Sequence, residues 1–120
     1  MAWERFEGGK VGRKSLHPTL SILKVQRGRP NSEPMFRLTF NKNAAETFSL
    51  KNYKACDLYF DPGTKRIGIR PDNSGINKIS HGKRNPPIIH ATLFIKQYNI
   101  EPKNSIPLKI ENNMIVTEQL

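Results

Sequence analysis

The chain has 120 residues, of which 36% are hydrophobic and 25% charged, and this composition fits one small globular domain with a modest core. Its apolar runs are far too short to span a membrane, its start is not a secretory signal, and its single cysteine provides neither a disulfide framework nor a zinc cluster, so we expect a cytoplasmic protein without cofactor or metal. Twenty Lys and Arg against ten Asp and Glu give a net charge of +10, which favours a polyanionic partner.

The first segment of the chain predicts a basic arm. Residues 1–18 are rich in Gly, Lys and Arg, and their apolar residues have no clear period, so we expect this arm to be flexible. Trp3 and Phe6 are three residues apart and would pin the arm to the domain body, with base stacking as the alternative. Residues 19–120 are expected to form a single globular domain.

The next stretch predicts two strands and a short helix. Apolar and polar residues alternate over 20–25 and again over 35–40, and the intervening 27–34 contains Gly, two Pro and Asn, which break the chain. Asn43 followed by Glu46 resembles a capping box, so a helix of about two turns is expected to start there.

The sequence KACDLYFDPGTKRIGIRP, residues 54–71, predicts a hairpin with one apolar face and one polar, basic face. Pro62 suits the first central position of the turn, and Gly63 supplies the positive φ expected at the next position. Lys65 and Arg66 lie beside this turn, and we expect them on the same basic surface as the segment that follows.

That following segment, residues 72–87, is predicted to be a polar, basic linker. It is rich in Pro, Gly and Asn, and its only acid is Asp72. The linker would join two halves of the domain.

The second half of the domain repeats the pattern of the first. A short helix is expected to end near Tyr98, and two strands are expected around Asn112 and Asn113. A shift of 50 residues aligns Leu38 with Ile88, Phe48 with Tyr98, Leu50 with Ile100, Leu58 with Leu108 and Phe60 with Ile110. The sequence therefore predicts two pseudo-repeats, 36–71 and 88–120, each too small to bury its apolar faces alone.

The first repeat contains RLTFNKNAAETFSLKNYKACDLYFDPGTKRIGIRP and resembles the AbrB/SpoVT/MazE group of swapped-hairpin DNA-binding modules. The second repeat resembles that group more weakly, so the chain is similar to the tandem arrangement of MraZ-type members, in which one chain carries two copies. The resemblance implies an α+β, mostly β fold, in which two strand–short helix–hairpin units pack as a swapped-hairpin-like barrel. It also implies a DNA-binding transcription regulator or an antitoxin-like factor.

Catalysis is not expected from this sequence. The acids are few and scattered, and His17, His81 and His90 show no metal-ligand spacing. Cys56 alternates with polar neighbours in the predicted hairpin and is expected to be a small core residue.

Nucleic-acid contact is instead expected from basic side chains of the arm, the strands, the hairpin and the linker. These candidates are Arg13, Lys14, Lys24, Arg27, Arg29, Lys65, Arg66, Arg70, Lys78, Lys83 and Arg84. Arginine makes bidentate contacts with phosphate or guanine, and lysine acts as a point charge. DNA is the expected partner and RNA the alternative within that class. A non-catalytic protein–protein interaction module that docks an acidic partner is the second interpretation, and a homodimer through exposed strand edges is a further option.

Overall fold

A computed structural model describes residues 17–25, 33–82 and 86–120. The strands in this part of the chain are β1 (Thr19–Val25), β2 (Met35–Phe40), β3 (Ala55–Asp61), β4 (Arg66–Pro71), β5 (Asn77–Ser80), β6 (Ile88–His90), β7 (Lys103–Glu111) and β8 (Met114–Thr117). The helical elements are α2 (Lys42–Thr47), the 3-10 helix η1 (Leu50–Asn52) and α3 (Thr92–Gln97). The prediction of a mostly β fold with short helices is confirmed.

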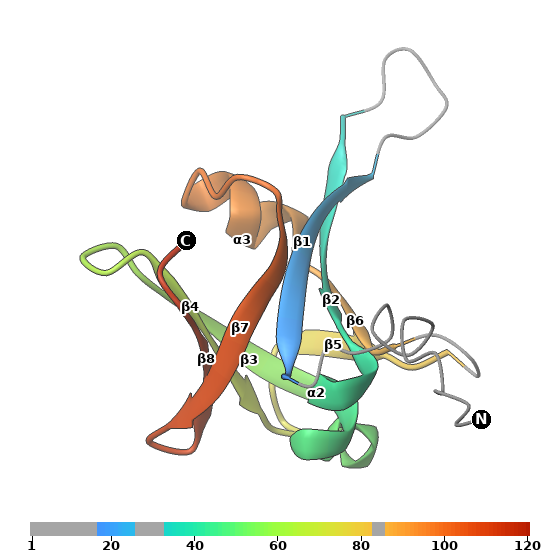
Figure 1. The fold of residues 1–120 in the computed structure, drawn as a ribbon. Coiled ribbons are helices and arrows are strands. Elements are labelled where there is room, and N and C mark those ends of the chain that lie inside the picture. The colour runs from blue at the N-terminus through green and yellow to red at the C-terminus, as the bar shows by residue number, and fades with distance from the viewer. Residues whose placement is uncertain (1–16, 26–32, 83–85) are drawn as a thin grey trace, which may run out of the picture.

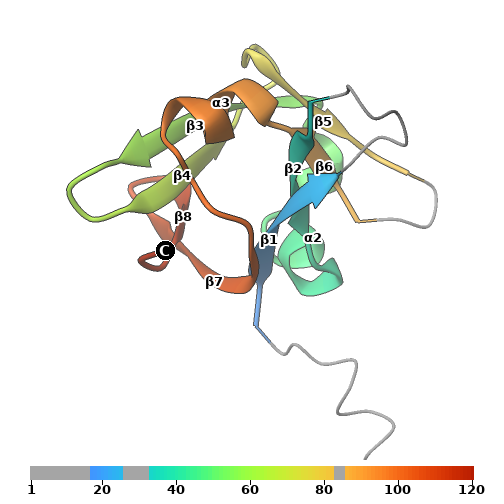
Figure 2. The ribbon, with the colours of Figure 1, turned by 90° about the horizontal axis from the view of Figure 1, so that it is seen from above.

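The eight strands close into one antiparallel barrel in the order β1-β2-β6-β5-β3-β4-β8-β7 (Figures 1 and 2). Ring closure is completed by β1 and β7, which pair through Thr19 with Pro107 and Leu20 with Ile106. Every described strand therefore has a neighbour on both sides. Pairing is partial at two places in the ring, since β5 pairs only with Ala55 and Cys56 of β3 and β8 pairs only with Gly68 and Ile69 of β4. A homodimer through exposed strand edges stays a prediction.

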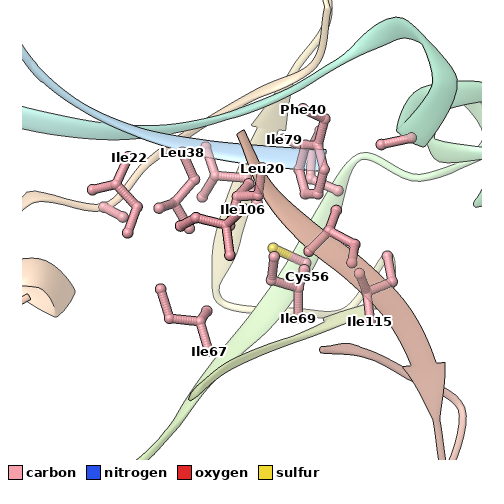
Figure 3. Close-up of a cluster of buried hydrophobic side chains, with 14 of the residues drawn as sticks. Leu20, Ile22, Leu38, Phe40, Cys56, Ile67, Ile69, Ile79, Ile106 and Ile115 are labelled. Atoms are coloured by element: carbon pink, nitrogen blue, oxygen red, sulfur yellow. The ribbon is translucent and has the colours of Figure 1, made fainter. Parts of the chain in front are cut away.

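The interior of the barrel is filled by aliphatic side chains from all eight strands. Figure 3 shows the buried residues Leu20, Ile22, Leu38, Phe40, Cys56, Ile67, Ile69, Ile79, Ile106 and Ile115, and β6 adds Ile89. Alternation along each strand sends these side chains inward and their polar neighbours outward. The prediction that Cys56 is a core residue is confirmed, since its side chain is fully buried.

The first helix starts two residues earlier than the capping-box pattern predicted. Asn41, not Asn43, is the N-cap, and its side-chain Oδ1 accepts a hydrogen bond from the backbone N–H of Ala44 at 2.8 Å. The same oxygen accepts from the N–H of Thr19 at 3.0 Å, so Asn41 also ties the helix to the start of β1. Asn43 lies inside the helix, where its side chain accepts from the hydroxyl of Thr47. The chain turns directly out of β2 into α2, and this places the cap at the strand's end.

The β3–β4 turn differs from the predicted geometry. No glycine in the described residues has a positive φ, and the left-handed position is Lys65, with a φ of 53°. The carboxylate of Asp61 accepts from the N–H of Gly63 at 2.9 Å and from that of Thr64 at 3.4 Å. This arrangement makes a longer loop in which an Asx-type turn precedes a closing residue in the left-handed region.

The segment predicted as a linker contains β5, which is part of the barrel. Ala55 and Cys56 of β3 pair with Lys78 and Asn77, and the other side of β5 pairs with β6. The composition of this segment did not indicate a strand, because only Ile79 of the four residues in β5 is buried in the core. The second-half helix and the hairpin around Asn112 and Asn113, in contrast, are confirmed.

Candidate nucleic-acid interface

The predicted contact residues divide into two groups. Those that lie outside the described residues are Arg13, Lys14, Arg27, Arg29, Lys83 and Arg84. Those that the structure places are Lys24, Lys65, Arg66, Arg70 and Lys78, and all of these except Arg66 are exposed.

At the β3–β4 turn, Lys65 and Arg66 have different surroundings. Lys65 points into solvent, and its carbonyl accepts a hydrogen bond from the N–H of Leu120 at 2.9 Å. Arg66 is half-buried; its guanidinium donates to the carbonyl of Thr117 at 3.0 Å and forms an ion pair with Glu111. This guanidinium holds the pKa of the Glu111 carboxyl below its usual value. Arg66 thus links β4 to β7 and β8, whereas Lys65 keeps its charge available.

Contrary to the sequence prediction, this turn does not share a surface with residues 72–82, which are the part of the predicted linker before its undescribed residues. Lys78 lies opposite Ala55 at the first residue of β3, and the turn follows Asp61 at its last residue. A strand rises ~3.3 Å per residue, so the two ends of β3 are ~20 Å apart. Figures 1 and 2 both show the β3–β4 turn on the opposite side of the barrel from β5 and β6.

Basic side chains instead lie at the start of β3 and on its two neighbouring strands. We call this region the basic corner; it contains Lys54, Arg70 and Lys78, with the imidazole of His81 after β5. The N–H of Ile79, which follows Lys78, donates to the carbonyl of Lys54 at 2.9 Å. All four side chains are exposed, and none forms an ion pair with another described residue. The ring Nε2 of His81 lies 2.7 Å from the carbonyl of Tyr53, which precedes Lys54.

Two acids lie near this corner, and both hold the β4–β5 loop. Asp57 is opposite Arg70 in the β3–β4 register, and its carboxylate accepts from the N–H of Ile76 at 3.1 Å. The carboxylate of Asp72 accepts from the N–H of Ser74 at 2.8 Å. The side chain of Asn73 adds a third bond, from the N–H of Lys54 at 2.8 Å. The loop therefore fixes the backbone of the corner while its cations stay free for a ligand.

A further cationic position lies on the outer face of β2 and was missed by the sequence analysis. Arg37 has Leu23 of β1 as its register partner on one side and His90 of β6 on the other. Its Nε is buried and has no hydrogen-bond partner. Its alternation with Leu38 was the available signal, because that pattern places Arg37 outside the barrel. Lys24 is exposed near the end of β1, where it lies opposite Phe36 and follows the register partner of Arg37.

The described residues carry no arrangement typical of a catalytic or metal site. No group of three or more His, Cys, Asp or Glu in these ranges is placed to hold a metal ion. Burial raises the pKa of the Cys56 thiol to about 12, so it stays protonated near neutral pH and is a poor nucleophile. Across the described helices, none is long and apolar enough to cross a membrane.

The arrangement as a whole offers exposed ammonium and guanidinium donors on the barrel, three of them at the basic corner. Such groups bind phosphate and carboxylate oxygens. Comparison of the chain with known protein families, with characterised proteins and with solved structures finds no significant match.

Proposed function

We propose that the protein is a non-catalytic nucleic-acid-binding protein that contacts phosphates through the basic corner, and that its barrel is a tandem swapped-hairpin arrangement of the AbrB/SpoVT/MazE type. DNA bound by a transcription regulator or antitoxin-like factor is the leading case. The observation that carries the proposal is the basic corner, where Lys54, Arg70 and Lys78 lie at one end of three adjacent strands without an ion-pair partner in the described chain.

The order of elements supports the tandem arrangement. Two strands, a short helix and two strands occur twice along the described chain. The helices span 42–47 and 92–97, which are 50 residues apart, and each is followed by a left-handed residue, Ser49 with φ 52° and Asn99 with φ 50°. Such agreement in a rare backbone conformation is expected of two copies of one unit.

The order of strands in the ring supports hairpin exchange between the halves. The hairpin β1–β2 lies between β7 and β6, and β3–β4 lies between β5 and β8. Each hairpin of the first half is thus flanked on both sides by strands of the second half. Gly68 of β4 pairs with Val116 of β8. These two positions are equivalent at a shift of 48 residues, because the turn between β7 and β8 is two residues shorter than the turn between β3 and β4. Equivalent strands that pair with each other in this way are expected about a two-fold relation between the copies.

Electrostatics supports a polyanionic ligand. The chain carries +10, and the ion pairs formed between described residues are only Arg66–Glu111, Lys96–Glu33 and Lys109–Glu111. Most of the described cations are therefore uncompensated at short range. Binding that neutralises phosphates releases counterions, so affinity must fall steeply as salt is added.

The test is a binding titration with duplex DNA, single-stranded DNA and structured RNA across a salt series. A variant carrying Lys54→Gln, Arg70→Gln and Lys78→Gln should lower affinity at least about tenfold. It should also flatten the salt slope by ~0.9 for each duplex phosphate that the variant no longer neutralises.

The matched control removes three charges elsewhere, at Lys42, Lys96 and Lys109, of which the last two are already ion-paired with glutamates. Equal losses for both triple variants would show that net charge alone, and not the corner, drives binding. Failure of all three nucleic acids at low salt would contradict the proposal and would favour an acidic protein as the partner.

A further inference from the structure

A groove on the far side of the barrel from the basic corner has no role in the function proposed above. It lies between the end of α3, the β3–β4 turn and the last residue of the chain, and its volume is about 640 Å³. Figure 1 shows these three segments together at the upper left of the molecule. We call it the tyrosine groove, and the residues used here are Phe60, Lys65, Tyr98 and Lys103.

Tyr98 forms a rigid, partly open platform in this groove. Its ring centroid lies 4.8 Å from that of Phe60, with the planes tilted by 33°. The ring of Phe94 meets it edge-on at 5.3 Å and 67°. Two aromatic neighbours therefore fix the ring of Tyr98, while 38% of the residue remains exposed. A fixed aromatic ring with free surface is the feature on which an unstacked base can lie.

Two lysines accompany the platform. Lys65 and Lys103 line the groove, both are exposed, and neither forms an ion pair or a side-chain hydrogen bond with a described residue. The position of Lys65 is set by its left-handed backbone and by the hydrogen bond from Leu120 to its carbonyl. Among the residues that the structure places, Glu101 is the one acidic side chain that lines the groove. The groove thus combines an aromatic surface with two ammonium groups that have no ion-pair partner among the described residues, and these groups complement a base and its adjoining phosphates.

A second groove, of about 590 Å³, occupies the corresponding place in the other half of the chain. Phe48 and Ser49 stand there at the positions 50 residues before Tyr98 and Asn99. Ile110 and Asn113 replace Phe60 and Lys65, so this groove has neither the stacked aromatic pair nor a lysine at the turn. This second groove is lined by Tyr53 and by Arg70 of the basic corner instead, so the feature that distinguishes the tyrosine groove is an aromatic pair in contact together with two lysines.

We infer that the tyrosine groove binds an unstacked nucleobase on Tyr98, with Lys65 and Lys103 contacting the adjoining phosphates, so that this groove, unlike the basic corner, selects single-stranded over duplex nucleic acid. The inference rests on the proposed nucleic-acid binding and specifies the class of ligand. Duplex DNA keeps its bases stacked in pairs and cannot place one on the ring, whereas a single strand can at small cost.

Fluorescence anisotropy with labelled oligo(dT) and with a duplex of the same length tests this inference. Tyr98→Leu keeps apolar packing against Phe60 and removes the stacking surface, and Lys103→Gln removes one exposed charge without altering the core. Each should lower oligo(dT) affinity by at least about fivefold. Lys103→Gln should also reduce the single-strand salt slope by roughly 0.7. Duplex affinity should stay within about twofold for both variants.

Tyr59→Leu, which removes an exposed aromatic ring that lines neither groove, is the control and should leave both affinities unchanged. Thermal unfolding of Tyr98→Leu verifies that the variant is folded, and Lys103→Gln provides the same test from an exposed site. Unchanged oligo(dT) affinity in both groove variants, with a loss in the corner variant, would overturn the groove and leave the proposed function standing. Equal losses for oligo(dT) and duplex would also overturn the preference for single strands. A native protein that binds neither nucleic acid would overturn both proposals.

Discussion

Gly75 is the point where the β4–β5 loop comes closest to β3, and its replacement by alanine tests how the basic corner is held in place. A Cβ at this position would lie 2.5 Å from both the backbone C and O of Cys56 and 2.8 Å from its Cα. These atoms belong to a strand in the barrel wall and cannot rotate away. The loop itself would have to move, although the N–H of Gly75 donates to the carbonyl of Asp72 at 2.8 Å.

Overpacking of this kind costs ~1–3 kcal/mol. For a chain of this size, 1 kcal/mol lowers the melting temperature by roughly 4 °C, so Gly75→Ala should lower it by about 4–12 °C. Far-UV circular dichroism during heating measures the shift. The loop also positions Lys54 through Asn73, so the same variant should weaken nucleic-acid binding at the corner.

Gly68→Ala is the matched control for this substitution. Its Cβ would lie 2.7 Å from the Cε and Sδ atoms of Met114, which are the far end of a flexible side chain. Met114 can change rotamer, and alanine is favoured over glycine within a strand by ~0.5–1 kcal/mol, so the net effect should be close to zero. A Gly75→Ala protein as stable as Gly68→Ala would refute the inference that the backbone of Cys56 constrains the loop.

Three further predictions concern stability. The Cys56 thiol has its usual pKa of 9.0 in the unfolded chain and a pKa of about 12 when buried. Its contribution to the free energy of unfolding is therefore full below pH 9 and falls as pH rises toward 12. Cys56→Ala should remove this part of the pH dependence, up to ~1.4 kcal/mol per pH unit, as measured by urea unfolding. Asn113 has a φ of 63° beside Asn112 at 51°, so Asn113→Gly should raise the free energy of unfolding by roughly 0.5–1 kcal/mol, and a decrease would argue against the left-handed turn. Leu38→Ala should cost ~2–5 kcal/mol because the side chain is fully buried, while Leu93→Ala, at 84% exposure, should cost less than ~0.5 kcal/mol; similar values would contradict the assigned core.

Most strands could be predicted from the sequence, because every second residue of a barrel strand faces the apolar interior. Leu38 and Phe40 of β2, for example, are buried where the period-two pattern placed them. Apolar alternation did not decide which residue caps the first helix. Asn41 and Asn43 both qualify as helix caps by residue type, and long-range contacts of the Asn41 side chain with His17 and with Thr19 at the start of β1 favour Asn41. Strand β5 escaped because a single buried residue leaves no period to recognise.

The candidate site was less predictable than the fold. Exposure of Arg70 and Lys78 follows from alternation and from a polar context, and both are exposed. Whether they lie near each other depends on which strands pair with β3. The sequence of a strand does not show which strand of the other half it pairs with. The engagement of Arg66 by Glu111 is likewise a long-range contact, since 45 residues separate the two.

The alternation of the two halves around the ring has a consequence for how the chain is made. Strands β1 to β4 emerge from the ribosome before their second-half neighbours do, and the ring closes only when β7 and β8 have emerged. Until then the nascent chain carries open strand flanks that can capture other nascent chains. Cleavage within 81–87, between β5 and β6, would leave unpaired strand edges on both fragments. Each fragment should therefore aggregate when separate, and the two should form the closed barrel again when mixed.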